Sequence, residues 1–154
     1  ELSDFTNSPA EMVAGKNWLS FSRTGKVAGE KAELTKKFTF KNGGIDYEIK
    51  IEAESTARLI YVCELNFHLW DMKNLKINNE NCGRLHAGDF FNISDSLTAE
   101  IAIYAEGAEG AFSSIFSTVS QSEKGVDLTA QGMSLFIPVS FSGSLSLKGR
   151  LKTA

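Results

Sequence analysis

Hydrophobic and polar residues alternate with a period of two along much of this chain. Over residues 45–52, isoleucine and tyrosine alternate with aspartate, glutamate and lysine, which predicts a strand with one buried face and one charged face exposed to solvent. Alternating residues 34–40 precede it, and the connection Lys41-Asn42-Gly43-Gly44 carries the Asn-Gly signal of a tight turn. Residues 32–52 are therefore predicted to form a β-hairpin.

The same alternation recurs in the second half of the chain. Residues 97–105 alternate, a glycine-bearing segment follows at 106–110, and residues 111–120 resume an extended pattern, which together predict a second hairpin. Further strands are expected at 18–23, 133–139 and 144–151, a long connection at 78–88, and a short helix only at 9–14. Many short strands with glycine-bearing turns predict an all-β fold, an antiparallel β-sandwich, in a single domain over residues 1–154.

The longest predicted strand covers residues 57–70, and its two faces differ in chemistry. Every second residue from 59 to 69 is apolar, which suits the space between two packed sheets. The opposite face carries, in order, Ile60, Val62, Glu64, Asn66, His68 and Trp70. The last four side chains can bond sugar hydroxyls and offer an aromatic surface to a sugar ring. Alternatively, Glu64 and Asn66 hold a neighbouring loop or a partner domain, with residues 118–123 or the Gln131-Gly132 turn as the expected partners, and His68 is satisfied nearby.

A second polar segment is a further candidate for binding. Residues 118–125 include Gln121 and Glu123, and Gln131-Gly132 follows shortly afterwards. Most of these side chains form hydrogen bonds without ionising readily, which suits the orientation of hydroxyl or backbone groups better than proton transfer.

Charge and cysteine content narrow the classes of partner. The chain of 154 residues has a formal net charge of -3, which disfavours nucleic acid as a partner, because binding to phosphates depends mainly on Lys and Arg. No uninterrupted apolar stretch is long enough to cross a membrane, so no membrane partner is expected. Cys63 and Cys82 are expected to be free thiols, which favours a cytoplasmic location. No metal ligand set and no cofactor motif is apparent, and none is expected.

The sequence offers little for catalysis. Glycoside hydrolysis needs two opposed carboxylates, and the carboxylates to be considered are Glu64, Asp71, Asp89 and Glu123. Each has an easier structural interpretation, as a loop anchor or as an exposed charge. No Gly-x-Ser-x-Gly motif occurs and no motif sets a histidine beside a serine, so a hydrolytic triad is not expected.

The polar segment also carries a family resemblance. The run Thr-Val-Ser-Gln-Ser-Glu at 118–123 with Gly125, followed by Gln131-Gly132, resembles the C-terminal β-sandwich domain of family 57 glycoside hydrolases, the α-amylase and 4-α-glucanotransferase type. Other pieces resemble that domain in the same order: Asp4-Phe5 with Asn7 and Pro9, Leu19 to Arg23, Lys37-Phe38, Tyr47 to Ile49, and Glu64 to Phe67. The tryptophan expected shortly before Thr118 is absent, with Phe112 and Phe116 in its place.

The resemblance implies a mutarotase-like supersandwich that acts as a non-catalytic accessory domain. It would dock on the N-terminal catalytic barrel of the same polypeptide and shape the cleft for an α-glucan, with Glu64, Asn66, Gln121 and Gln131 as the contact residues. In that family the catalytic carboxylates lie in the barrel, which has no counterpart here. Because the chain begins at Glu1 without a leader, we expect it to be a domain excised from a longer enzyme.

Two alternatives remain open from the residues. A free-standing carbohydrate-binding module would use Trp70 and His68 as an open platform for sugar. A small mutarotase-like isomerase would use His68 or His86 together with a carboxylate.

Overall fold

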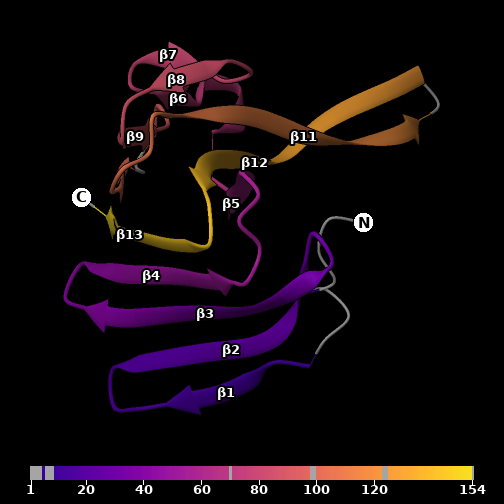
Figure 1. Ribbon diagram of the computed structural model, residues 1–154. Coiled ribbons are helices and arrows are strands. Elements are labelled where there is room, and N and C mark those ends of the chain that lie inside the picture. Colours follow the sequence, from indigo (N-terminus) through magenta and orange to yellow (C-terminus); the bar gives the residue numbers. More distant parts are fainter. Residues whose placement is uncertain (1–4, 6–8, 70, 98–99, 123–124, 154) are drawn as a thin grey trace.

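The strands of the protein form two antiparallel sheets that face each other (Figure 1). The computed structural model describes residues 5, 9–69, 71–97, 100–122 and 125–153, and apart from isolated turns and a short 3-10 helix, η2 (Met72–Asn74), these residues are mostly strand. The predicted all-β sandwich is therefore confirmed. No helix in the described ranges is long and apolar enough to span a membrane.

The larger sheet has nine strands. In spatial order they are β1 (Glu11–Ala14), β2 (Trp18–Val27), β3 (Glu30–Lys41), β4 (Gly44–Ala53), β13 (Ser144–Thr153), β10 (Glu100–Ala105), β9 (Phe90–Ser94), β6 (Lys76–Ile77) and β7 (Glu80–Asn81). The predicted hairpin at 32–52 is β3 and β4, which pair from Ala32↔Ala53 to Lys41↔Gly44. Only Gly43 of the two connecting residues has a positive φ, 74°, a conformation that costs glycine little.

The smaller sheet has four strands. Their spatial order is β5 (Leu59–Phe67), β12 (Gly125–Phe141), β11 (Gly110–Ser122) and β8 (Leu85–Ala87). β12 is longer than β5, so the expectation that the strand around 57–70 would be the longest is wrong. The connection predicted at 78–88 instead contains β7 and β8, and it takes the chain from the larger sheet to the smaller one.

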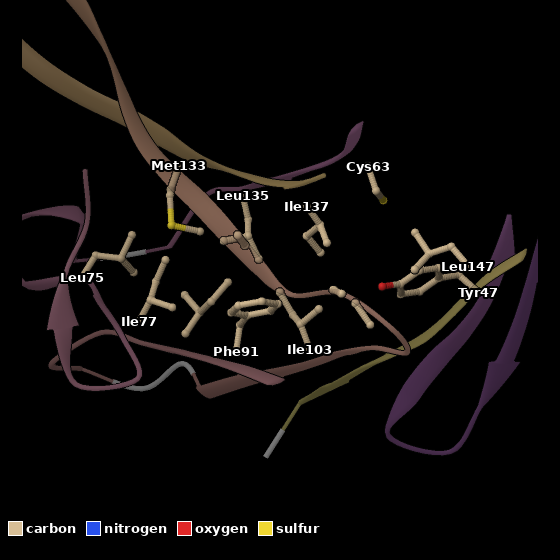
Figure 2. Packing of buried hydrophobic residues seen from close by; sticks show 14 of the residues in the cluster. Tyr47, Cys63, Leu75, Ile77, Phe91, Ile103, Met133, Leu135, Ile137 and Leu147 are labelled. Atoms are coloured by element: carbon tan, nitrogen blue, oxygen red, sulfur yellow. The ribbon is translucent and has the colours of Figure 1, made fainter. Parts of the chain in front are cut away.

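The hydrophobic core lies between the two sheets (Figure 2). Met133, Leu135 and Ile137 of β12 face Ile77, Phe91 and Ile103 from the larger sheet. Along β5, Cys63 is buried, while Tyr61, Leu65 and Phe67 pack partly buried against the same cluster. The apolar face of that strand is therefore confirmed as an inter-sheet face.

Two of the predicted elements are wrong. Residues 11–14 form β1, not a helix, and pair with β2 from Glu11↔Ser22 to Ala14↔Leu19. So short a helix would be costly to nucleate, and the edge of β2 supplies partners for its backbone. The strands at 100–105 and 110–122 do not form a hairpin. β10 pairs with β9 and β13, whereas β11 pairs with β12 and β8.

Candidate functional site

The face of the four-stranded sheet that is turned away from the core is the first candidate for function, and we call it the outer face. Residues that pair across antiparallel strands project to the same side, so the register places side chains in rows. One row runs Glu64, Phe136, Phe112, Leu85 over β5, β12, β11 and β8. The next row along the strands is Asn66, Ser134, Ser114. The outer face therefore collects residues that are far apart in the sequence.

One region of the outer face is apolar although it is open to solvent. We call these side chains the apolar patch: Ile60, Val62, Leu85, Phe112, Phe136 and Pro138. Leu85 is 76% and Ile60 67% exposed, and the rings of Phe112 and Phe136 stack with centroids 6.4 Å apart. Contiguous exposed apolar surface of this kind marks an interaction site more often than a free surface.

The predicted pair Glu64 and Asn66 borders the apolar patch. Both side chains are exposed, and both lie near the buried hydroxyl of Ser134 on β12. The Ser134 Oγ donates to Asn66 Oδ1 at 2.5 Å, and Glu64 Oε1 is 3.3 Å away. Sequence reasoning placed the two on the correct face. The partner that the described residues show for both is Ser134, whereas we expected residues 118–123 or Gln131-Gly132.

Contacts to Gln131 are made by other residues. The Nδ1 of His68 is hydrogen-bonded to the backbone carbonyl of Gln131, and the Gln131 Nε2 donates to Thr118 Oγ1 at 3.1 Å. His68, just after β5, and Thr118 of the polar segment thus both bond Gln131. Gln121 lies farther out on β11 and is exposed. Trp70 and Glu123 lie outside the described residues.

β11 and β12 continue beyond the rest of the sheet as a two-stranded arm (Figure 1). We call residues 117–122 and 125–131 the extended hairpin. Its register starts after a bulge at Phe116/Ser117, and it contains the directly opposed pair Val119↔Leu128, which are 69% and 74% exposed. An isolated two-stranded hairpin is only marginally stable in water, so packing against another surface would stabilise this arm.

A histidine does lie beside a serine, contrary to the sequence-based expectation. The Nε2 of His86 is 2.9 Å from Ser113 Oγ, and its Nδ1 is 3.8 Å from a carboxylate oxygen of Glu80. The pairing of β8 with β11 brings the two together, which no local motif could show. Ser113 is fully buried and already accepts the N–H of Gly83 at 3.1 Å, so no substrate reaches its oxygen. The group is a structural connection.

The buried Cys63 thiol is also unsuited to catalysis. Burial raises the pKa of the Cys63 thiol to about 11, which leaves it protonated at neutral pH. Both cysteines are free, as expected. Within the described ranges, no group of three or more His, Cys, Asp or Glu side chains could hold a metal ion.

Sequence reasoning missed the apolar patch. Its residues come from four strands, and alternation within one strand cannot show which strands are neighbours. The usable signal was the position of Ile60 and Val62 on the side of their strand opposite to the side that packs into the core.

Comparison with known families supports the resemblance read from the sequence. A family model described as "Alpha-amylase/4-alpha-glucanotransferase, C-terminal" matches residues 1–151. A search of the curated proteins found no match.

Solved structures share the fold. A 4-alpha-glucanotransferase from Thermococcus litoralis aligns with a TM-score of 0.85 and 22% identity, over 99% of this chain and 23% of that chain. A putative aldose 1-epimerase from Escherichia coli K12 aligns with a TM-score of 0.69 and 7% identity, over 94% of this chain and 68% of that one. The Slr1438 protein from Synechocystis sp. PCC 6803 aligns with a TM-score of 0.60 and 10% identity, over 95% of this chain and 66% of that one. The likeness to an epimerase fits the predicted mutarotase-like sandwich.

The identities to these structures are low, so they show a shared fold and no more. The family model, in contrast, covers nearly the whole sequence, including the motif at 118–132. The chain spans about a quarter of the length of the glucanotransferase that it matches. On the family match, the chain belongs to the C-terminal domain family of the alpha-amylases and 4-alpha-glucanotransferases.

Proposed function

We propose that this chain is the non-catalytic accessory domain of a cytoplasmic α-glucan-processing enzyme, and that its outer face docks on the catalytic barrel of the same polypeptide. The apolar patch is the observation that carries this proposal. Burying its exposed side chains against a second domain would remove apolar surface from water, which is the main favourable contribution to docking.

Polar groups at the border of the apolar patch would fix the orientation in which the two domains dock. Glu64 and Asn66 present an exposed carboxylate and amide beside apolar neighbours. Interfaces commonly combine an apolar centre with a polar rim of this kind. The extended hairpin continues the same sheet, and we propose that it lies along the barrel and helps to form the wall of the glucan cleft.

The occupant is proposed to be the barrel because the family is defined as the C-terminal part of a larger enzyme. The matched glucanotransferase is about four times as long as this chain, so most of that polypeptide lies outside the shared fold. A domain of that size offers ample surface to cover the patch.

The test compares the isolated 154-residue chain with the full-length polypeptide. We expect Leu85→Lys and Val62→Lys to lower the Tm of the full-length polypeptide by about 4 °C or more, because each places a charge in a buried apolar contact. The same changes should shift the Tm of the isolated chain by less than about 1 °C, since both side chains are exposed there.

Met12→Lys is the matched control. Met12 is 64% exposed on β1, at the far edge of the other sheet, so this change should leave both Tm values unaltered. Equal shifts in the two proteins, or no shift in the full-length polypeptide, would contradict docking through the apolar patch. A full-length polypeptide that dimerises through the same residues would replace the barrel by a second copy as the occupant.

A further inference from the structure

The nine-stranded sheet has a hollow of about 760 Å³ on the face turned away from the core. Its side chains come from β3, β4, β13, β10 and β9, which are consecutive in the sheet. The sequence predicted only that the charged side of residues 45–52 would face solvent. The structure adds that this charged side lies next to two aromatic residues, Phe90 on β9 and Tyr104 on β10.

A single row crosses the hollow. The register aligns Thr39, Asp46, Arg150, Tyr104 and Phe90 on the five strands. With strands about 4.8 Å apart, this row is roughly 19 Å long, which is enough for several sugar rings. Tyr104 is 42% and Phe90 51% exposed. The row therefore has one open aromatic end and one charged end.

Hydrogen bonds and an ion pair hold the charged side chains of this row in position. The guanidinium of Arg150 holds Asp46 through two bonds, Nε to Oδ1 at 2.5 Å and Nη2 to Oδ2 at 3.1 Å, and Lys41 pairs with the same carboxylate. These partners hold the pKa of Asp46 well below its ordinary value. Asp46 is therefore an acceptor at any moderate pH, not a proton donor.

The neighbouring row repeats the arrangement. Glu48 lies 3.9 Å from Lys148 and 3.4 Å from Lys50, and Lys37 is its partner in register from β3. Lysine and arginine side chains here are about half exposed, while the two carboxylates are about 70% covered. Donors and acceptors thus alternate along the floor and remain within reach of a ligand.

Tyr104 is supported from beneath. The hydroxyl of buried Tyr47 donates to the Tyr104 carbonyl at 3.2 Å. The ring of Tyr47 passes so close to Gly149 that a Cβ at this position would lie 2.2 Å from it. Glycine at 149 on β13 therefore leaves room for the Tyr47 side chain of β4 to reach the Tyr104 carbonyl of β10. This hydrogen bond holds the backbone that carries the exposed Tyr104 ring.

We propose that this hollow binds a linear neutral oligosaccharide, with its sugar rings against Tyr104 and Phe90 and its hydroxyls on the Asp46–Arg150 pair. An aromatic face with a few placed polar groups suits a sugar ring, and paired ions provide both donors and acceptors for hydroxyls. The lining carries three cations and two carboxylates, so its net charge is small, and the two open aromatic rings favour a neutral sugar over a compact anion. The choice of an α-1,4-glucan as the ligand rests on the proposed function, whereas the location of the sugar site rests only on the side chains of the hollow.

The test is calorimetric titration of the 154-residue chain, which has its own core, with maltoheptaose. We expect saturable binding that changes little between low and high salt, because a neutral ligand releases no counterions. Tyr104→Ala and Phe90→Ala should each weaken binding about tenfold, the loss expected for one aromatic contact. Their Tm values should remain near that of the parent, since both rings are half exposed.

Phe116→Ala is the matched control. Phe116 is 46% exposed on the other sheet, so its loss should leave binding unchanged. If Phe116→Ala weakens binding and Tyr104→Ala does not, the sugar lies on the outer face and the hollow is rejected. The hollow is also rejected if maltoheptaose, cellohexaose and hexagalacturonate all fail to bind.

The remaining outcomes separate this inference from the proposed function. Binding of cellohexaose alone, sensitive to Tyr104→Ala, would support the hollow and overturn its assignment to α-glucans. Salt-sensitive binding of hexagalacturonate alone would overturn the neutral ligand. The docking test with Leu85→Lys concerns the opposite side of the molecule, so either proposal can fail without the other.

Discussion

The hydroxyl of Ser134 has one hydrogen and two acceptors within reach, Asn66 at 2.5 Å and Glu64 at 3.3 Å. If Asn66 is truncated, the hydroxyl can turn to Glu64, and the reverse substitution leaves the bond to Asn66 intact. Asn66→Ala and Glu64→Ala should therefore each cost less than about 0.5 kcal/mol of unfolding free energy. The double variant should cost about 1–2 kcal/mol, because it leaves a buried hydroxyl without an acceptor.

Denaturant unfolding of the four members of this cycle measures the coupling between the two side chains. Repeating the cycle with Ser134→Ala provides the control, because the coupling should then vanish. Additive effects of the two single substitutions would show that Ser134 does not depend on either acceptor.

The buried imidazole of His86 predicts a loss of stability in acid. Burial is the main cause that lowers the pKa of His86, with a smaller contribution from Arg84, while Glu80 opposes both. A histidine whose pKa is lower in the folded state stabilises the fold fully above its unfolded pKa of about 6.5. That stability is lost as the pH falls below this value, because the unfolded chain takes up the proton more readily.

We therefore expect the Tm to fall between pH 7 and pH 5, and the fall to be smaller in His86→Gln, whose amide can still bond Ser113. His68→Gln is the control, since His68 is the other histidine of the chain and is exposed. Thermal unfolding at several pH values measures both. An unchanged slope in His86→Gln would assign the acid sensitivity to other groups.

At the scale of elements, strand positions followed from the sequence more readily than strand partners. Alternation located β4 and the buried face of β5 correctly, because burial of one face dictates residue type at every second position. The pairing of β10 could not be read in this way. Its segment, residues 100–105, has the same alternation whichever strand it joins, and the turn at 106–109 carries the chain to the opposite sheet.

For the candidate site too, the sequence predicted which face a residue occupies but not which residues it contacts. Glu64 and Asn66 interrupt an apolar strand, so their exposure on the outer face was expected and is confirmed. Their bonds to Ser134 were not expected, because that serine is almost 70 residues away in the sequence and is brought near only by the β5–β12 register. The hollow is a stronger example, since its row draws one residue from each of five strands.

At the scale of the molecule, the two proposed surfaces lie on opposite sides of the sandwich. The apolar patch belongs to the four-stranded sheet and the hollow to the nine-stranded sheet, with the shared core between them. A domain that docks through the first surface therefore leaves the second open to solvent. Such an arrangement would let the domain hold an α-glucan near a catalytic barrel without taking part in the reaction.

This arrangement predicts that the 154-residue chain binds α-1,4-glucan without changing it. A glycosidase needs a carboxyl group that still carries its proton near neutral pH. Arg150 and Lys41 hold the pKa of Asp46 low, and hydrogen bonds from Ser96 and Asn74 lower that of Asp71. Neither can serve as the general acid, and Glu64 lies on the outer face, away from the hollow.

Incubation of the chain with maltoheptaose, followed by chromatography of the sugars, should therefore return maltoheptaose alone. The full-length polypeptide is the positive control, because the same assay should give shorter or longer glucans when the barrel is present. Products formed by the repurified chain that disappear in Asp46→Asn would place a reaction in the hollow itself. Products that survive Asp46→Asn and disappear in Glu64→Gln would place it on the outer face, and in either case the accessory role would be wrong.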